Sequence, residues 1–156
     1  MIDATFLAVL VIAGALLAWI DLCSGIIPNW LNIAIAAAGL ARVTLLESLT
    51  AAVVAGVEGI AAGLAVWLLR WFFFSLRKYQ GLGLGDVKLL AASANWIGIA
   101  GVPVQLLAGS LTALAAAGML RLAGHDMTRQ TSLPFGPFLV IGLLAAVALD
   151  EIRIGY

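Results

Sequence analysis

Residues 4–22 read ATFLAVLVIAGALLAWIDL, a run in which only Asp21 carries a formal charge. A helix of about 20 apolar residues crosses a hydrocarbon layer of about 30 Å. Similar runs fill the chain of 156 residues, of which 64% are hydrophobic and 10% charged, against about 25% charged in soluble domains. Because a membrane-spanning segment must satisfy its backbone groups internally, the sequence predicts an all-α membrane protein.

Six apolar runs predict a polytopic bundle of about six transmembrane helices. They cover residues 4–22, 30–46, 51–76, 88–102, 103–123 and 134–150. Only Gly101-Val102-Pro103 marks the boundary between the fourth and fifth runs, and the fourth is short for a bilayer. Since no linker or separate polar segment interrupts the runs, we expect residues 1–156 to form a single transmembrane domain embedded in a lipid bilayer.

The distribution of basic residues sets the expected orientation. One side holds loops 23–29, 77–87 and 124–133, with Arg77, Lys78, Lys88, Arg121 and Arg129 in or beside them. The other side holds both chain ends, with Arg42 and Arg153. The positive-inside rule therefore predicts a multi-pass protein of the inner (cytoplasmic) membrane whose three loops face the cytoplasm. The acidic start of the chain lacks the basic region of a signal peptide, so we expect the first run to remain in the mature protein.

The composition excludes several other kinds of site. Eight Lys and Arg balance eight Asp and Glu, so the net charge itself says nothing about a nucleic-acid partner, and we expect none. Cys23 is the only cysteine, which excludes an intramolecular disulfide and a zinc site built from several thiolates. The single histidine, His125, lies in a polar loop and is expected to be solvated. We predict neither a metal nor a cofactor.

Three polar stretches stand out against the apolar background, and all three map to the predicted cytoplasmic side. The first contains Asp21 and Asn29, the second is Gly81–Lys88 with Asp86 inside it, and the third is Leu133–Phe138. Placing a carboxylate at the end of a membrane span costs free energy, so an aspartate at such a position is a candidate functional residue. The structural alternatives are a solvated charge at a helix end for Asp21 and a helix N-cap for Asp86.

Two carboxylates in one place suggest acid and base chemistry. A pair that shares one proton can supply a base that activates water and an acid that polarises and protonates an amide. Asp21 and Asp86 are expected on the same membrane face, so they fit this requirement. The sequence therefore predicts an aspartic hydrolytic site without a metal.

The three stretches resemble, in the same order, the signatures of the type IV prepilin peptidases. The matching segments are Asp21 with Ile27-Pro28-Asn29, then Gly83-Leu84-Gly85-Asp86-Val87-Lys88, then Leu133-Pro134-Phe135-Gly136-Pro137-Phe138. The resemblance covers residues 21 to 138, and its Gly-x-Gly-Asp motif is shared with presenilin-like membrane proteases. It implies that Asp21 and Asp86 are the catalytic pair of an endopeptidase that removes leaders from prepilin-like or preflagellin-like proteins.

The resemblance carries further implications. Substrates of the family have a short basic leader ending in glycine, then an apolar helix, and are cut on the cytoplasmic side. Long members add an N-terminal segment with paired cysteines and methylate the product; because this chain starts at its first span, we expect a peptidase without N-methyltransferase activity. Several residues are expected to bind substrate or shape the site: Pro28, Asn29, Gly83, Gly85, Lys88, Pro134 and Gly136.

Two other classes of function are compatible with parts of the sequence. A small ion- or proton-coupled membrane transporter would use Asp21, Asp86 and Glu58 to bind ions. A catalytically silent assembly factor would keep the resemblance without the chemistry. Retention of both aspartates, and the three ordered signatures around them, favour the peptidase.

The remaining charged and aromatic residues have expected structural roles. Arg42 and Glu58 are predicted to pair across the second and third runs, and Arg70 to extend toward the lipid headgroups. Gly59-x-x-x-Gly63 predicts close helix packing inside the bundle. The tryptophans mostly lie near span ends and are predicted to be interface anchors. They are Trp19, Trp30, Trp67, Trp71 and Trp96.

Overall fold

The computed structural model describes residues 3–77, 82–124 and 134–154, and these form five α-helices without a β-strand. The helices are α1 (Ala4–Ser24), α2 (Asn29–Leu46), α3 (Leu49–Arg77), α4 (Leu84–Leu122) and α5 (Gly136–Ile154). The predicted all-α class is confirmed. By length and composition, α1 to α4 are able to cross a membrane. The predicted count of six spans is not confirmed.

Capping residues determine where α1 begins and ends and where α2 begins. Asp3 caps α1, because its side chain accepts a hydrogen bond of 2.7 Å from the backbone N–H of Thr5. At the other end of α1, Gly25 takes a left-handed conformation and donates its N–H to the carbonyl of Asp21. Pro28 then occupies the N-cap position of α2, so a short turn connects the two helices.

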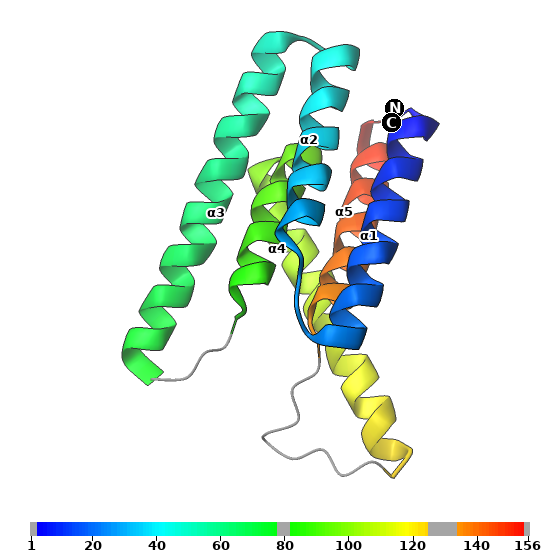
Figure 1. Ribbon diagram of the computed structural model, residues 1–156, viewed down its shortest axis with the longest axis vertical. Helices are drawn as coiled ribbons and strands as arrows, with labels where there is room; N and C mark the ends of the chain where they lie inside the picture. The colour runs from blue at the N-terminus through cyan, green and yellow to red at the C-terminus, as the bar shows by residue number, and fades with distance from the viewer. Residues whose placement is uncertain (1–2, 78–81, 125–133, 155–156) are drawn as a thin grey trace.

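Helix α4 is two limbs joined by a sharp bend at Gly98. This residue has φ 65° and ψ 169°, a backbone conformation that L side chains rarely adopt. We call residues 84–97 the first limb and residues 99–122 the second limb. Figure 1 shows the chain rising through the first limb and descending through the second, beside α5. The predicted boundary at Gly101–Pro103 is therefore misplaced, because Pro103 lies inside the second limb.

A buried hydrogen bond across the bend holds the two limbs together. Gln105 Nε2 donates to Ser93 Oγ at 3.0 Å and to the Leu139 carbonyl at 3.1 Å. In a straight helix, residues 93 and 105 would be about 18 Å apart along the axis. Both side chains are fully buried, and the second bond also ties α4 to α5. The bend is thus part of the packed core.

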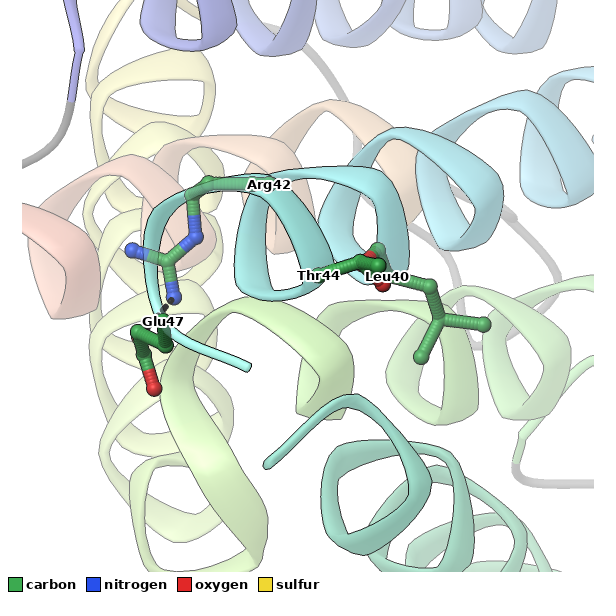
Figure 2. Close-up of polar contacts among 4 residues, drawn as sticks. All are labelled: Leu40, Arg42, Thr44 and Glu47. Atoms are coloured by element: carbon green, nitrogen blue, oxygen red, sulfur yellow. Dashed lines mark hydrogen bonds and ion pairs between the residues drawn. The ribbon is translucent and has the colours of Figure 1, made fainter. Parts of the chain in front are cut away.

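Two of the expected roles of charged residues change in the structure. Glu58 Oε2 accepts the backbone N–H of Ile99 at 3.1 Å, which satisfies a free donor at the start of the second limb. Arg42 approaches Glu47 instead, with 4.0 Å between Nη2 and Oε1, as Figure 2 shows at the end of α2. The predicted pairing of Arg42 with Glu58 is therefore wrong.

The prediction that Trp96 is an anchor at the membrane interface is also wrong. Trp96 is buried, and its Nε1 donates to the carbonyl of Ile35 at 2.8 Å. It lies just before the bend, so the short first limb leaves it inside the bundle, where Arg42 stacks 5.8 Å from its ring centroid. The other four tryptophans are exposed on the surface of the structure.

The predicted close packing of helices at Gly59 and Gly63 is confirmed. A Cβ added at Gly59 would lie 2.7 Å from Asn95 Oδ1, and one at Gly63 would lie 2.9 Å from Ala91 Cβ. Both glycines therefore allow α3 to pack closely on the first limb of α4. Their close contacts lie within a single chain.

The helices place two separate groups of polar residues at opposite ends of the bundle. Figure 1 shows the start of α1 and the end of α5 at one end, with the loop between α2 and α3. The end of α1 and the starts of α2, α4 and α5 gather toward the other end. The described residues of the three polar stretches singled out in the sequence belong to this second end, which positions the candidate site.

Candidate active site

Asp21 lies in the last turn of α1 and is held by the start of α5. Its side chain is buried, with 4% of the residue exposed, and Oδ2 accepts the backbone N–H of Gly136 at 2.9 Å. A Cβ added at Gly136 would lie 2.6 Å from the same oxygen. A larger residue here would therefore require α5 or the Asp21 side chain to shift, which gives a physical reason for the glycine of the third stretch.

Asp86 lies in the first turn of α4 and is also held by a backbone N–H. It is 8% exposed, and Oδ2 accepts the N–H of Gly83 at 3.1 Å. The structural alternative for Asp86 is partly right, because its carboxylate binds the N-terminus of the helix. The N-cap position itself belongs to Gly83, however.

Gly85 brings the start of α4 against the turn between α1 and α2. A Cβ at Gly85 would lie 2.9 Å from Ile27 Cβ, well inside ordinary contact distance. This close approach places the second polar stretch next to the first. It explains why the residue before Asp86 is small.

The two aspartates line the same cavity, whose volume is about 380 Å³. The structure thus brings together the two residues that the sequence predicted as a pair. The other lining residues come from the turn after α1 and from the start of α4. They are Gly25, Ile26, Ile27, Asn29, Gly83, Leu84, Gly85 and Lys88.

Lys88 and Asn29 form one wall of this cavity. Lys88 Nζ donates to Asn29 Oδ1 at 2.8 Å, which links the first limb of α4 to the start of α2. The bond directs the ammonium group to an amide oxygen and leaves it at the edge of the space that contains both carboxylates. The arrangement can hold a polar substrate segment beside two carboxylates.

Three predicted site residues, Pro28, Pro134 and Gly136, are not among the residues that line the cavity. Pro28 occupies the N-cap position of α2, and Pro134 lies just before α5. Gly136 acts through its bond to Asp21. Gly81, His125 and Leu133 lie outside the described residues. Within the described ranges, no group of three or more His, Cys, Asp or Glu side chains is arranged to hold a metal ion.

Arg70 supports the site in a way that the sequence did not predict. Its Nε donates to the carbonyl of Leu82 at 2.6 Å, so α3 holds the segment that leads into Asp86. The expected extension of Arg70 toward headgroups stays a prediction. The available signal was an arginine within an apolar helix, which usually marks a specific partner.

Comparisons with known proteins identify the family of the chain. The model of the type IV leader peptidase family matches residues 8–118. A prepilin leader peptidase/N-methyltransferase of Burkholderia pseudomallei is 36% identical over 138 residues, covering 87% of this chain and 44% of the relative. The proteins of the same name from Aeromonas hydrophila and Legionella pneumophila are 34% and 36% identical and each cover 90% of the chain.

The chain spans about half the length of these curated relatives, between 44% and 50% in the three cases. No solved structure matches the chain significantly. The matched segment contains Asp21 and Asp86, whereas Gly136 lies beyond the residues of the family model.

Proposed function

The chain belongs to the type IV leader peptidase family, and we propose that it is an aspartic endopeptidase with Asp21 and Asp86 as its catalytic carboxylates. The observation that carries this proposal is the shared cavity: two buried carboxylates, from the end of α1 and the start of α4, line one space. Each is fixed by a single backbone N–H through Oδ2. Such a pair can divide the roles of base and acid.

The proposed reaction is hydrolysis of one peptide bond. One carboxylate, in its ionised form, takes a proton from a water molecule as the water oxygen attacks the carbonyl carbon. The other, in its protonated form, donates a hydrogen bond to the carbonyl oxygen and stabilises the charge that develops there. The C–N bond then breaks as the amide nitrogen receives a proton from the pair, and the products are a new carboxylate and a new amine.

Fixed positions of the two carboxylates support this reaction. The N–H of Gly136 orients Asp21 and the N–H of Gly83 orients Asp86, so neither side chain must be ordered when substrate arrives. The scissile bond must be extended to enter the cavity, because an intact helix hides its amide groups. The open wall formed by residues 25–27 and 83–85 offers room for such a segment.

We propose prepilin-like or preflagellin-like proteins as substrates, cut after a glycine on the cytoplasmic side of the inner membrane. Basic residues near the loops of the catalytic end support this orientation. Cys23, the only cysteine and an exposed one, lies two residues from Asp21 and provides a test. A membrane-impermeant maleimide should label it in inverted vesicles and not in intact spheroplasts. Labelling from the outer side alone would refute the orientation.

Cleavage by defined variants tests the chemistry. The protein, reconstituted with a prepilin-like substrate, should release a leader ending in glycine, identified by mass spectrometry of both products. Asp21→Asn and Asp86→Asn should each lower the rate by at least about 10³-fold, since each removes a proton-transfer group. Equal thermal unfolding of the variants and the wild type provides the folding control. A fully active Asp86→Asn variant would exclude the mechanism.

The relatives' names also include N-methyltransferase, and the proposal concerns the peptidase step alone. The absence of methyl transfer stays a prediction. Incubation of the cleaved product with a labelled methyl donor would test it, and label on the new N-terminus would contradict it.

A further inference from the structure

The peptide group that joins Leu82 to Gly83 is hydrogen-bonded on both sides. Its carbonyl oxygen accepts the Nε–H of Arg70, with 2.6 Å between nitrogen and oxygen, and its N–H donates to Asp86 Oδ2 at 3.1 Å. In a trans peptide the carbonyl and the N–H lie in one plane and point in opposite directions. We call this group the bridging peptide, because it connects the guanidinium of Arg70 in α3 to the carboxylate of Asp86 in α4.

The bridging peptide is rigid, so the positions of its two partners are coupled. Because the peptide is planar, a shift of the Leu82 carbonyl turns the N–H of Gly83, which is the donor that holds Asp86. The two bonds also support each other electrostatically, since the N–H end of the peptide dipole faces the carboxylate and its oxygen end faces the guanidinium. Hydrogen bonds linked in this way polarise one another. Loss of one bond should therefore weaken the other.

The peptide that holds Asp21, by comparison, is fixed by its own helix. The N–H of Gly136 donates to Asp21, and the carbonyl of the same peptide belongs to Phe135. That carbonyl accepts the N–H groups of Phe138 and Leu139, both at 3.1 Å. The first turn of α5 therefore orients this peptide without help from a side chain.

The bridging peptide lies outside the hydrogen-bonding pattern of α4. Gly83 occupies the N-cap position, and its carbonyl accepts the N–H of Val87 at 3.3 Å, as the first turn of a helix requires. The carbonyl of Leu82 lies one residue before this cap. Its donor, Arg70, comes from a different helix. The orientation of the N–H that holds Asp86 therefore depends on α3.

The setting of Arg70 indicates that this contact is specific. An arginine inside an apolar membrane helix costs free energy and usually has a defined partner. The aromatic neighbours Trp67, Trp71 and Phe74 are exposed on the surface of α3. Arg70, in contrast, is half-buried, and its partner Leu82 is half-buried and packs against the hydrophobic core. A hydrogen bond that is partly shielded from water is electrostatically stronger than an exposed one.

We propose that Arg70 is a positioning residue for Asp86, and that it acts by holding the bridging peptide whose N–H orients the carboxylate. This inference rests on the proposed function, because a fixed Asp86 affects the rate only if Asp86 takes part in the reaction. Arg70 is not among the residues that line the cavity of the two aspartates, so its effect passes through the peptide and not through the substrate. The proposal gives α3 a part in catalysis that none of the three polar stretches indicates.

Three substitutions at position 70 separate the hydrogen bond from the charge. Arg70→Gln carries an amide nitrogen on Cδ, the atom that carries Nε in arginine, so it keeps a donor at that place and loses the charge. Arg70→Lys keeps the charge but has a methylene group there. Arg70→Met has a methyl group there and keeps neither property. Cleavage of a prepilin-like substrate is measured for each variant, and kcat and KM are determined separately.

The hydrogen bond, and not the charge, should determine kcat. Arg70→Met should lower kcat about tenfold and leave KM within about twofold of wild type, because a carboxylate loses its fixed position while substrate binding is unchanged. Arg70→Gln should keep kcat within about threefold of wild type. Equal kcat values for Arg70→Gln and Arg70→Met would overturn the proposal. So would an active Arg70→Lys enzyme beside an inactive Arg70→Gln enzyme, or an effect on KM alone, which would indicate a substrate contact.

Arg42→Met is the matched control for the loss of an arginine. Arg42 lies near the end of α2, at the opposite end of the bundle, where its Nη2 is 4.0 Å from Glu47 Oε1. The kcat of this control should stay within about twofold of wild type. Melting curves of all variants define the folded fraction, to which each rate is normalised. If Arg70→Met does not fold, Arg70→Lys replaces it, and an Arg70→Gln enzyme slower than Arg70→Lys then overturns the proposal.

A double-mutant cycle tests the bridging peptide without using activity. Arg70→Met is combined with Asp86→Asn, at the carboxylate that this peptide holds, or with Asp21→Asn, at the carboxylate that a different peptide holds. Partners in one hydrogen-bond network are coupled, whereas independent sites give additive effects. The drop in melting temperature caused by Arg70→Met should be at most about half as large in the Asp86→Asn protein as in the wild type, and unchanged in the Asp21→Asn protein.

Equal drops in all three backgrounds would overturn the proposal, because an arginine that only fastens α3 to α4 would cause the same loss in each. Failure of the proposed function would appear differently, as cleavage that survives Asp21→Asn and Asp86→Asn. That result would remove the catalytic role of Asp86, whereas the coupling between Arg70 and Asp86 would still be measured.

Discussion

The two ends of the bundle both contain carboxylates that accept a backbone N–H, yet the ends differ in how those groups are surrounded. At the end with the candidate active site, Asp21 and Asp86 are both buried and line one cavity. At the opposite end, a cavity of about 410 Å³ contains Glu58 and Glu47 together with the guanidinium of Arg42. The same type of hydrogen bond thus occurs in two different settings.

The difference indicates which carboxylates are available for chemistry. Glu58 satisfies the first N–H of the second limb of α4, and this contact stabilises the bend at Gly98. Glu47 is exposed and lies 4.0 Å from Arg42, a surface pair of small energetic value. Asp21 and Asp86 share a space with each other. Two buried carboxylates facing one cavity, and not the number of carboxylates, therefore distinguish the candidate active site.

After replacement of either aspartate itself, the largest effect is expected from moving one of these two carboxylates. Gly136→Val places side-chain atoms within 2.6 Å of the present position of Asp21 Oδ2, so α5 or Asp21 must shift. A displacement of about 1 Å can cost about 10²-fold in rate. We therefore expect cleavage to fall by at least about 10²-fold.

The measurement is the initial cleavage rate, with Gly118→Val as the control for adding a valine to a helical glycine. An active Gly136→Val enzyme would show that the position of Asp21 is not critical. That result would remove the functional difference drawn between the end with Asp21 and the end with Glu58.

A substitution at the opposite end of the bundle should lower the free energy of unfolding and change the cleavage rate little. Glu58→Leu removes the acceptor for the N–H of Ile99, and a hydrogen bond to a charged group contributes about 1.5–3 kcal/mol. Because Glu58 is only partly buried, we expect the lower part of that range. Equilibrium unfolding in a denaturing detergent mixture measures it, and the cleavage rate of the folded fraction should stay within about threefold of wild type. Complete loss of cleavage in folded Glu58→Leu protein would contradict the separation of the two ends.

A smaller effect is expected at the aromatic side chain beside the bend. Trp96→Phe leaves the carbonyl of Ile35 without its 2.8 Å partner while it keeps an aromatic ring in the core. One such hydrogen bond contributes about 1 kcal/mol. The same unfolding assay should detect this loss, with Trp67→Phe, an exposed residue, as the control. A Trp67→Phe variant that loses more stability than Trp96→Phe would show that the burial assignment is wrong.

The residues of the candidate active site were predictable because their sequence signals are local. Gly85 and Gly136 are small where a Cβ would collide with Ile27 or Asp21, and both belong to short stretches that the sequence already separates from the apolar background. Fold class and the common face of the two aspartates follow from composition and loop positions. The hydrogen bond that orients Asp21 could not be predicted, because Gly136 meets Asp21 only after α5 packs on α1, whereas the bond from Gly83 to Asp86 is local.

The bend was misplaced because its causes are distant in the sequence. Gly101 and Pro103 provide a local signal for a break, whereas Gly98 resembles the many glycines that pack helices. Two contacts stabilise the bend at Gly98. Glu58 accepts the N–H of Ile99, and Gln105 donates a hydrogen bond to Ser93. Trp96 was misread for the same reason, since a tryptophan near a span end is usually an interface anchor unless the span ends inside the bundle.

The most direct test of the account compares carboxylates from the two ends in one experiment. Asp21→Asn, Asp86→Asn and Glu58→Gln each replace one carboxylate by an amide of nearly the same shape, and their cleavage rates on one prepilin-like substrate are measured in the same membranes. With all three proteins folded, the account predicts no detectable cleavage by the two aspartate variants and near-normal cleavage by Glu58→Gln. Active Asp86→Asn protein, or inactive Glu58→Gln protein with a normal melting curve, would contradict it.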